Sequence, residues 1–196
     1  DVPYLAINPL DVGRQYREVI RVNGQSGKGG VAYILEAEFG LELPKDMQRE
    51  FGPIANDLVD GLGREVRGEE LRVMFWKEYV EQEYPFSLGS FSTENNGHLS
   101  CFAQVYHKGE SRFITSVGNG PVDAFVRALI CQLKVPHFVV NAYHEHALAV
   151  GEGAQAIAYV QIEREGKTWW GASVDTNLER ASIKAVLSAI NRASAK

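Results

Sequence analysis

The sequence has little cysteine, no basic block and no long apolar run, and each absence excludes a class of protein. Its two cysteines, Cys101 and Cys131, lack CxxC spacing, so we expect reduced thiols of a cytosolic protein rather than a disulfide framework. Lys and Arg number 20 against 25 Asp and Glu, a net charge of −5. This balance disfavours a nucleic-acid partner, which needs a positive face. No apolar run approaches the ~20 residues of a membrane-spanning helix, so no membrane partner is expected.

What is present is ordinary globular composition, with 45% hydrophobic and 23% charged residues in 196. The chain opens with Asp1-Val2-Pro3-Tyr4, which has neither the basic region nor the apolar core of a signal peptide. No initiator Met precedes it, and we expect the sequence to be cut from a longer chain.

Residues 1–84 predict a small mixed linker subdomain. The apolar stripe Met47, Phe51, Ile54, Ala55 and Leu58 predicts a helix. The other elements expected here are a strand at Arg17–Asn23, a loop at Gly24–Gly30, a strand-like or buried element at Val31–Leu35, the opening of the first helix at Pro44 and its end at Gly61 and Gly63, and a second helix at Glu69–Gln82.

Residues 85–196 show a repeated pattern of three strands and a helix. The six strands expected are Phe86–Thr93, Leu99–Lys108, Ser111–Val117, His137–Ala149, Ala154–Glu165 and Lys167–Val174. One helix starts at Pro121 and the other spans Asn177–Ala193, opened by a capping box at Thr176–Glu179. Because neither half buries both its sheet and its helix, we expect two pseudo-symmetric βββα units that pack together, an α+β fold.

Two motifs suggest chemistry but fit it poorly. The run Gly24–Gly30 lacks the earlier Gly and the hydroxyl after Lys28 that a phosphate loop requires. His144 and His146 would share one face of a strand, but His137 would face the other way and no fourth metal ligand is indicated. No Ser stands in a GxSxG elbow. The residues therefore predict neither a catalytic centre nor a metal site.

The turn Gly118-Asn119-Gly120-Pro121 is the most informative local feature. It joins a strand to a helix, and its glycines allow close approach to backbone amides at a helix N-terminus, which favours a carboxylate. Asp123 lies in the first helical turn. It either complements the helix dipole or meets the ammonium group of a ligand.

Several segments resemble 2-isopropylmalate synthase, most closely the long form of that enzyme downstream of its barrel. The segments that carry the resemblance are Val2–Leu5, Asp11–Arg14, Val19–Tyr33, Leu43-Pro44, Lys77–Val80, Gly118–Pro121, Tyr143–Ala147, Ala154–Ala156, Trp170-Gly171 and Ala185–Arg192. They span essentially the whole chain, and the Gly24–Gly30 run is highly specific.

The resemblance implies the C-terminal part of an acyltransferase. That family condenses acetyl-CoA with 2-oxoisovalerate, using a divalent metal in a TIM barrel that this sequence lacks. The fragment alone should therefore be inactive, without catalytic residues, metal or cofactor of its own. The resemblance implies a linker over 1–84 and, over 85–196, a cytoplasmic homodimerising domain that binds leucine as feedback inhibitor and acts on its own upstream barrel.

The leucine pocket implied by the resemblance draws on three segments of the chain. Its expected residues are Gly118, Asn119, Gly120, Pro121, Val122, Asp123, Val140, Tyr143, Ala147, Ala154 and Ala156. Tyr4 is expected to reach the partner subunit's active site. Two alternatives stay open: an isoleucine-sensing regulatory domain of a citramalate synthase, and a dimerisation module without a ligand.

Overall fold

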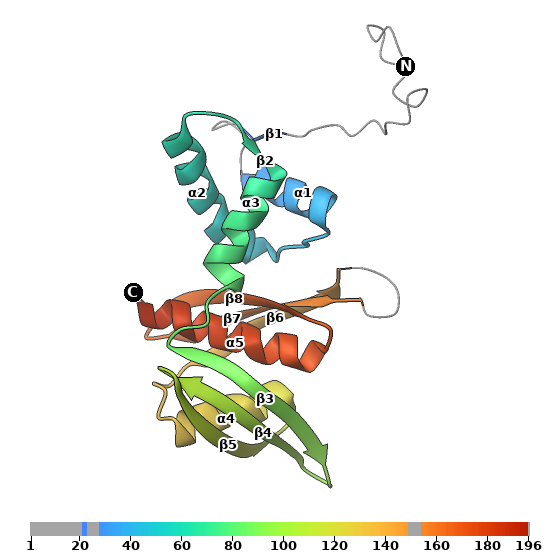
Figure 1. The fold of residues 1–196 in the computed structure, drawn as a ribbon, viewed down its shortest axis with the longest axis vertical. Coiled ribbons are helices and arrows are strands. Elements are labelled where there is room, and N and C mark those ends of the chain that lie inside the picture. The colour runs from blue at the N-terminus through green and yellow to red at the C-terminus, as the bar shows by residue number, and fades with distance from the viewer. Residues whose placement is uncertain (1–20, 23–27, 149–153, 196) are drawn as a thin grey trace, which may run out of the picture.

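The computed structural model describes residues 21–22, 28–148 and 154–195 (Figure 1). The first part of the chain is mainly helical and lies against the second of two three-stranded sheets. Its elements are β1 (Arg21–Val22), α1 (Lys28–Phe39), α2 (Lys45–Leu62), β2 (Val66–Arg67), α3 (Gly68–Phe75) and the π-helix η2 (Trp76–Val80). None of the described helices is long and apolar enough to cross a membrane.

The rest of the chain forms the two expected βββα units. The first contains β3 (Phe86–Asn95), β4 (Leu99–His107), β5 (Glu110–Gly118) and α4 (Pro121–Gln132). The second contains β6 (Val139–Ala147), β7 (Ala156–Arg164), β8 (Lys167–Asp175) and α5 (Leu178–Ala195). Each strand lies within about two residues of its predicted bounds.

The two units share detailed features as well as element order. Both sheets are antiparallel, in the orders β3-β4-β5 and β6-β7-β8. The first strand of each carries an irregularity, after Leu88 and after Val140. Lys108-Gly109 and Glu165-Gly166 turn the last hairpin of each unit with positive φ at both residues, which matches the twist of the flanking strands. The α+β prediction of a pseudo-symmetric pair is confirmed.

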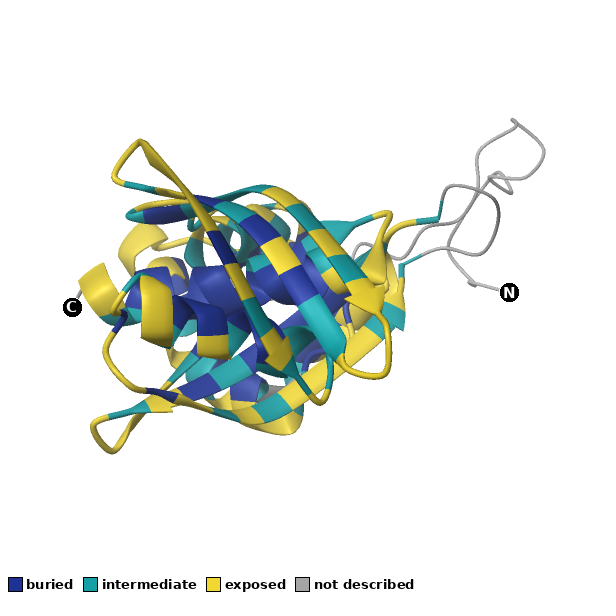
Figure 2. Ribbon diagram, turned by 90° about the horizontal axis from the view of Figure 1, so that it is seen from below, coloured by how far each residue is buried: buried dark blue, intermediate teal, exposed yellow. Residues whose placement is uncertain are grey.

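Two hydrophobic cores hold the layers together. One joins the inner faces of both sheets to α4 and α5. The other joins α1, α2 and α3 to the outer face of the second sheet, where Tyr159 and Trp170 are fully buried. The second sheet is therefore covered on both faces. The first is covered on one, and Figure 2 shows exposed residues recurring along its strands.

Three local predictions differ in detail from the structure. Of the two alternatives left open for Val31–Leu35, a strand or a buried element, the structure shows the buried element: the segment is part of α1, which already begins at Lys28, inside the predicted loop. Val31, Ile34 and Leu35 are buried while Tyr33 is exposed, a helical spacing that a five-residue apolar run cannot reveal alone. The first long helix runs through Gly61 to Leu62, and Gly63 alone ends it as the C-cap in a left-handed conformation.

The third concerns the start of α5. Asn177, not Thr176, caps this helix, its Oδ1 accepting the amide of Arg180 at 2.9 Å. The carboxylate of Glu179 accepts a hydrogen bond from the hydroxyl of Thr93 instead of completing a capping box.

Both cysteine thiols are free, and Cys101 is buried while Cys131 is exposed.

Candidate functional site

The N-terminal end of α4 is built from the Gly118–Pro121 turn. Gly118 ends β5 against the helix, and a Cβ there would lie 2.4 Å from the amide nitrogen of Ala124, so packing requires glycine at this position. Gly120 is the N-cap, with extended backbone, no side-chain cap and nothing within 4 Å of an added Cβ. Pro121 occupies the first helical position, where its missing N–H costs nothing. The helix end is therefore open beside Gly120.

Asp123 fixes the shape of this turn. One carboxylate oxygen accepts the Asn119 amide and the other accepts Nε of Arg127, both at 2.9 Å. The hydrogen bond from Arg127, followed by that from Asn119, lowers the pKa of Asp123. The carboxylate thus stays charged beside the helix N-terminus, as the dipole favours. Its predicted role toward a ligand ammonium stays a prediction.

The equivalent end of α5 is closed by its own side chains. In both units two residues separate the last strand from the helix, and Asn177 stands where Gly120 stands in the first unit. The side-chain oxygen of Asn177 accepts the backbone amide of Arg180, and the backbone amide of Asn177 donates to the carboxylate of Asp175. Lys184 and Arg180 also contact the Asp175 carboxylate, at 2.6 and 3.5 Å. Of the two helix starts, the first alone keeps its amides free of a side-chain cap.

The other predicted residues share one face of the β6–β7 hairpin. Tyr143 and Ala147, four residues apart on β6, both lie on the side of the strand that faces α5. The irregularity after Val140 brings Val140 to the same side. Ala147 is the Cα partner of Ala156 on β7. Small side chains therefore line the end of this hairpin, where Ala154 and Ala156 are half-buried.

Tyr143 connects this face to α5. Its hydroxyl lies 2.7 Å from Oγ of the buried Ser182 and donates to the carboxylate of Glu145. Burial, aided by Glu145, raises the pKa of Tyr143 to about 12, so the hydroxyl stays protonated. Sequence reasoning missed Ser182 and Glu145. Glu145 lies two residues from both Tyr143 and Ala147, a spacing that puts all three on the same face of a strand and could have identified it. No local pattern around Ser182 identifies that residue.

The structure thus places the predicted residues in two groups, one at the start of α4 and one along the β6–β7 hairpin, in which Val140 lies at the opposite end from Ala147 and Ala156. α5 packs against both α4 and the second sheet. Within residues 28–148 and 154–195, no hydrogen bond or ion pair joins the two groups directly. Tyr4 lies outside the described residues.

His144 and His146 point to the opposite face, toward the helical first part. Nε2 of His146 accepts the amide of Glu42 and lies 3.1 Å from the Tyr159 hydroxyl, and the ring of His144 lies near Trp170. Among the described residues, no group of three His, Cys, Asp or Glu side chains could hold a metal ion. The two histidines therefore serve packing between layers.

Two family models match the chain. The LeuA allosteric (dimerisation) domain matches residues 65–194, and the alpha-isopropylmalate synthase post-catalytic domain-like model matches residues 1–36.

Curated relatives carry the name 2-isopropylmalate synthase. Those from Azotobacter vinelandii, Clostridium acetobutylicum and Mycobacterium leprae are 42%, 41% and 44% identical, over 98%, 100% and 98% of this chain. The matched region is 34%, 36% and 32% of those proteins. The chain therefore spans about a third of the length of the relatives it matches.

Proposed function

Because the chain belongs to the LeuA allosteric (dimerisation) domain family, we propose that it is the regulatory C-terminal part of a 2-isopropylmalate synthase. The whole protein would be a cytoplasmic acyltransferase that condenses acetyl-CoA with 2-oxoisovalerate, on an upstream barrel holding a divalent metal. This part would bind leucine as feedback inhibitor, form a homodimer and have no activity alone. The relatives, matched over about a third of their length, support this proposal.

The open N-terminal end of α4 is the observation that carries leucine binding. The amides of Val122 and Asp123 belong to the first turn, and Gly120 supplies no side chain that would occupy them. The leucine carboxylate would accept these amides, as anions do at helix N-termini. The isobutyl group would contact Val122 and the small residues Ala154 and Ala156 at the turn end of the β6–β7 hairpin. Val140 would not take part, because its Cα partner Ile162 lies six residues along β7 from Ala156, about 20 Å in an extended strand. The ammonium would meet Asp123 or Glu145.

Replacing Gly120 by valine is expected to weaken leucine binding at least tenfold without unfolding the chain. The extended backbone at Gly120 suits any residue and the space around its Cβ is empty, so the added methyl groups would obstruct only the ligand. Isothermal titration calorimetry with leucine measures the loss. Thr176→Val, beside the capped start of α5, is the matched control and should bind as the parent chain does. Unchanged affinity in the Gly120→Val variant would remove this turn from the site.

The same titration separates the alternatives. Heat from isoleucine but not leucine would favour an isoleucine-sensing regulatory domain. A dimer that gives neither heat nor a thermal shift with leucine, isoleucine or valine would favour a module that only dimerises. In the full protein a coupling free energy of ~1–3 kcal/mol between the leucine site and the barrel would suffice for inhibition.

For the dimer, we propose that a second copy covers the outer face of the first sheet. Phe102 and Tyr106 on β4 and Phe113 and Val117 on β5 are exposed there, and Phe113 keeps 78% of its surface. The corresponding face of the second sheet is covered by the helical first part. An apolar sheet face of this kind is typical of an association surface.

Phe113→Asp is therefore expected to convert the dimer to a monomer, because it replaces the most exposed apolar side chain of this face by a carboxylate. Sedimentation or light scattering measures the mass. Tyr33→Asp changes an exposed aromatic residue on α1 and should leave the dimer intact. If both variants stay dimeric, the interface lies elsewhere.

A further inference from the structure

A cavity of about 910 Å³ lies where the two βββα units meet, at the end of the molecule opposite the starts of α4 and α5. Equivalent residues of both units line it: Lys108 and Glu165 from the two hairpin turns, and the residues at the carboxyl ends of the two helices. Its volume is that of pockets for small organic ligands. It shares no residue with the proposed leucine site.

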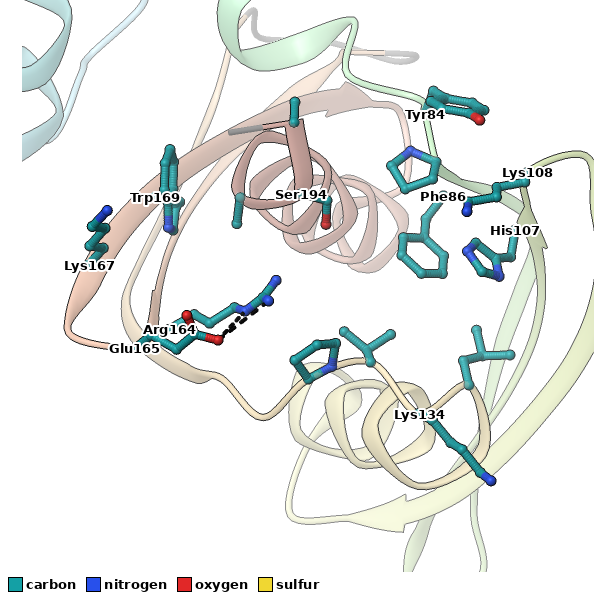
Figure 3. A pocket seen from close by; sticks show the side chains of 16 residues that line it. Tyr84, Phe86, His107, Lys108, Lys134, Arg164, Glu165, Lys167, Trp169 and Ser194 are labelled. Atoms are coloured by element: carbon teal, nitrogen blue, oxygen red, sulfur yellow. Dashed lines mark hydrogen bonds and ion pairs between the residues drawn. The ribbon is translucent and has the colours of Figure 1, made fainter.

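Positive charge gathers around this cavity although the chain as a whole is acidic. Lys108, Arg164 and Lys167 line it against one carboxylate, Glu165. A fourth basic residue, Lys134, also lines it, but its side chain points away (Figure 3). Within the described part of the chain no carboxylate pairs with any of the three lysines. The two helix ends contribute only about half a negative elementary charge each. The lining therefore stays positive, and a concave site concentrates that field.

The single ion pair in the cavity leaves its cation available. Arg164 extends from the end of β7 into the space, while Lys134 points away from it (Figure 3). Nε of Arg164 lies 3.4 Å from the carboxylate of Glu165, whose side chain is 77% exposed. Exposed pairs of this kind contribute little, so an incoming anion can replace Glu165 as the partner of Arg164.

Apolar and aromatic side chains form the rest of the lining. The Phe86 and His107 rings stack with centroids 4.5 Å apart, and Trp169 faces the cavity from β8 (Figure 3). Val135 and Phe86, both buried, are part of this lining. A bare inorganic ion would leave these surfaces unused, whereas a molecule with an aromatic or acyl body would cover them.

We propose that this cavity binds a small organic anion, a carboxylate or phosphate carried on an aromatic or acyl body. Arg164 and Lys108 would contact the anionic group, with Lys167 at the rim. Trp169 and the Phe86–His107 stack would contact the body. This site is separate from leucine binding and does not depend on it.

The test replaces two lysines of the cavity by glutamate, and each of them already has a glutamate at the equivalent position of the opposite unit. Glu165 adopts the same backbone conformation as Lys108, and Glu110 opens β5 where Lys167 opens β8. The double variant Lys108→Glu/Lys167→Glu should therefore fold, which its thermal midpoint checks. Lys45→Glu/Lys77→Glu makes the same charge change at exposed positions away from the cavity and is the matched control.

The probe is anilinonaphthalene sulfonate, an aromatic body with an anionic group, followed by fluorescence at low salt. We expect the cavity variant to bind it at least tenfold more weakly than the parent chain, and the control to bind within twofold of it. Displacement by adenosine monophosphate would assign a phosphate ligand, and displacement by 4-phenylbutyrate a carboxylate ligand. Equal binding by both variants, or displacement by neither compound, would overturn the proposal. Leucine calorimetry on the cavity variant should be unchanged, so this result is distinct from failure of the leucine site.

Discussion

Replacing Arg192 by alanine is expected to destabilise the chain by about 3 kcal/mol. The Arg192 side chain is 5% exposed, and its guanidinium contacts Glu50 of α2 at 2.9 Å, Glu78 of η2 and the carbonyl oxygen of Trp170. It also lies over the ring of Tyr79, 4.2 Å from its centroid. Its loss would leave two carboxylates without their shared cation. Because Glu50 and Glu78 are 28% and 32% exposed, water would soften the cost relative to a fully buried pair.

Urea unfolding of the 196-residue chain measures this difference. The control is the triple variant Arg192→Met, Glu50→Leu and Glu78→Leu, which removes all three charges and should recover most of the lost stability, since hydrophobic side chains of similar size often replace buried ion pairs without cost. A loss below about 1 kcal/mol for Arg192→Ala would mean that the three charges do not join the layers as the structure indicates.

Gly171→Ala is expected to cost about 3 kcal/mol, at the upper end of the range for overpacked cores. A Cβ at this position in β8 would lie 2.3 Å from both the carbonyl oxygen of Ala185 and the amide nitrogen of Ala189. Both atoms belong to the backbone of α5, so the helix itself would have to move off the sheet. Because α5 also packs on β3, the change would disturb the joint between the two units.

Gly61→Ala is the matched control for this substitution. Gly61 lies in α2, and nothing surrounds its added Cβ within 4 Å. Alanine should there stabilise the helix by roughly 0.5–1 kcal/mol, because glycine loses more backbone freedom on folding. Thermal and urea unfolding of the two variants should therefore change in opposite directions. Similar small effects in both would show that β8 and α5 are further apart than the structure places them.

The residues of the candidate site were predicted unevenly. The Gly118–Pro121 turn was identified because glycine and proline at a strand-to-helix junction have a defined local meaning. The contrast between the open Gly120 and the capped Asn177 became visible only when the two units could be compared in space. Ser182, the partner of Tyr143, lies 39 residues away from it and carries no local signal.

By itself the sequence determined the two βββα units. Alternating apolar residues, paired turn residues and helical stripes are local patterns. Over 85–195 they predicted the bounds of the strands and helices to within about two residues. Only the tertiary structure decided that Val31–Leu35 is helical, which sheet face is covered, and that Ser188, Asn191 and Arg192 on α5 are buried. Those outcomes depend on contacts between residues up to 114 positions apart, such as Arg192 with Glu78. The spacing of residues within one segment does not predict such contacts.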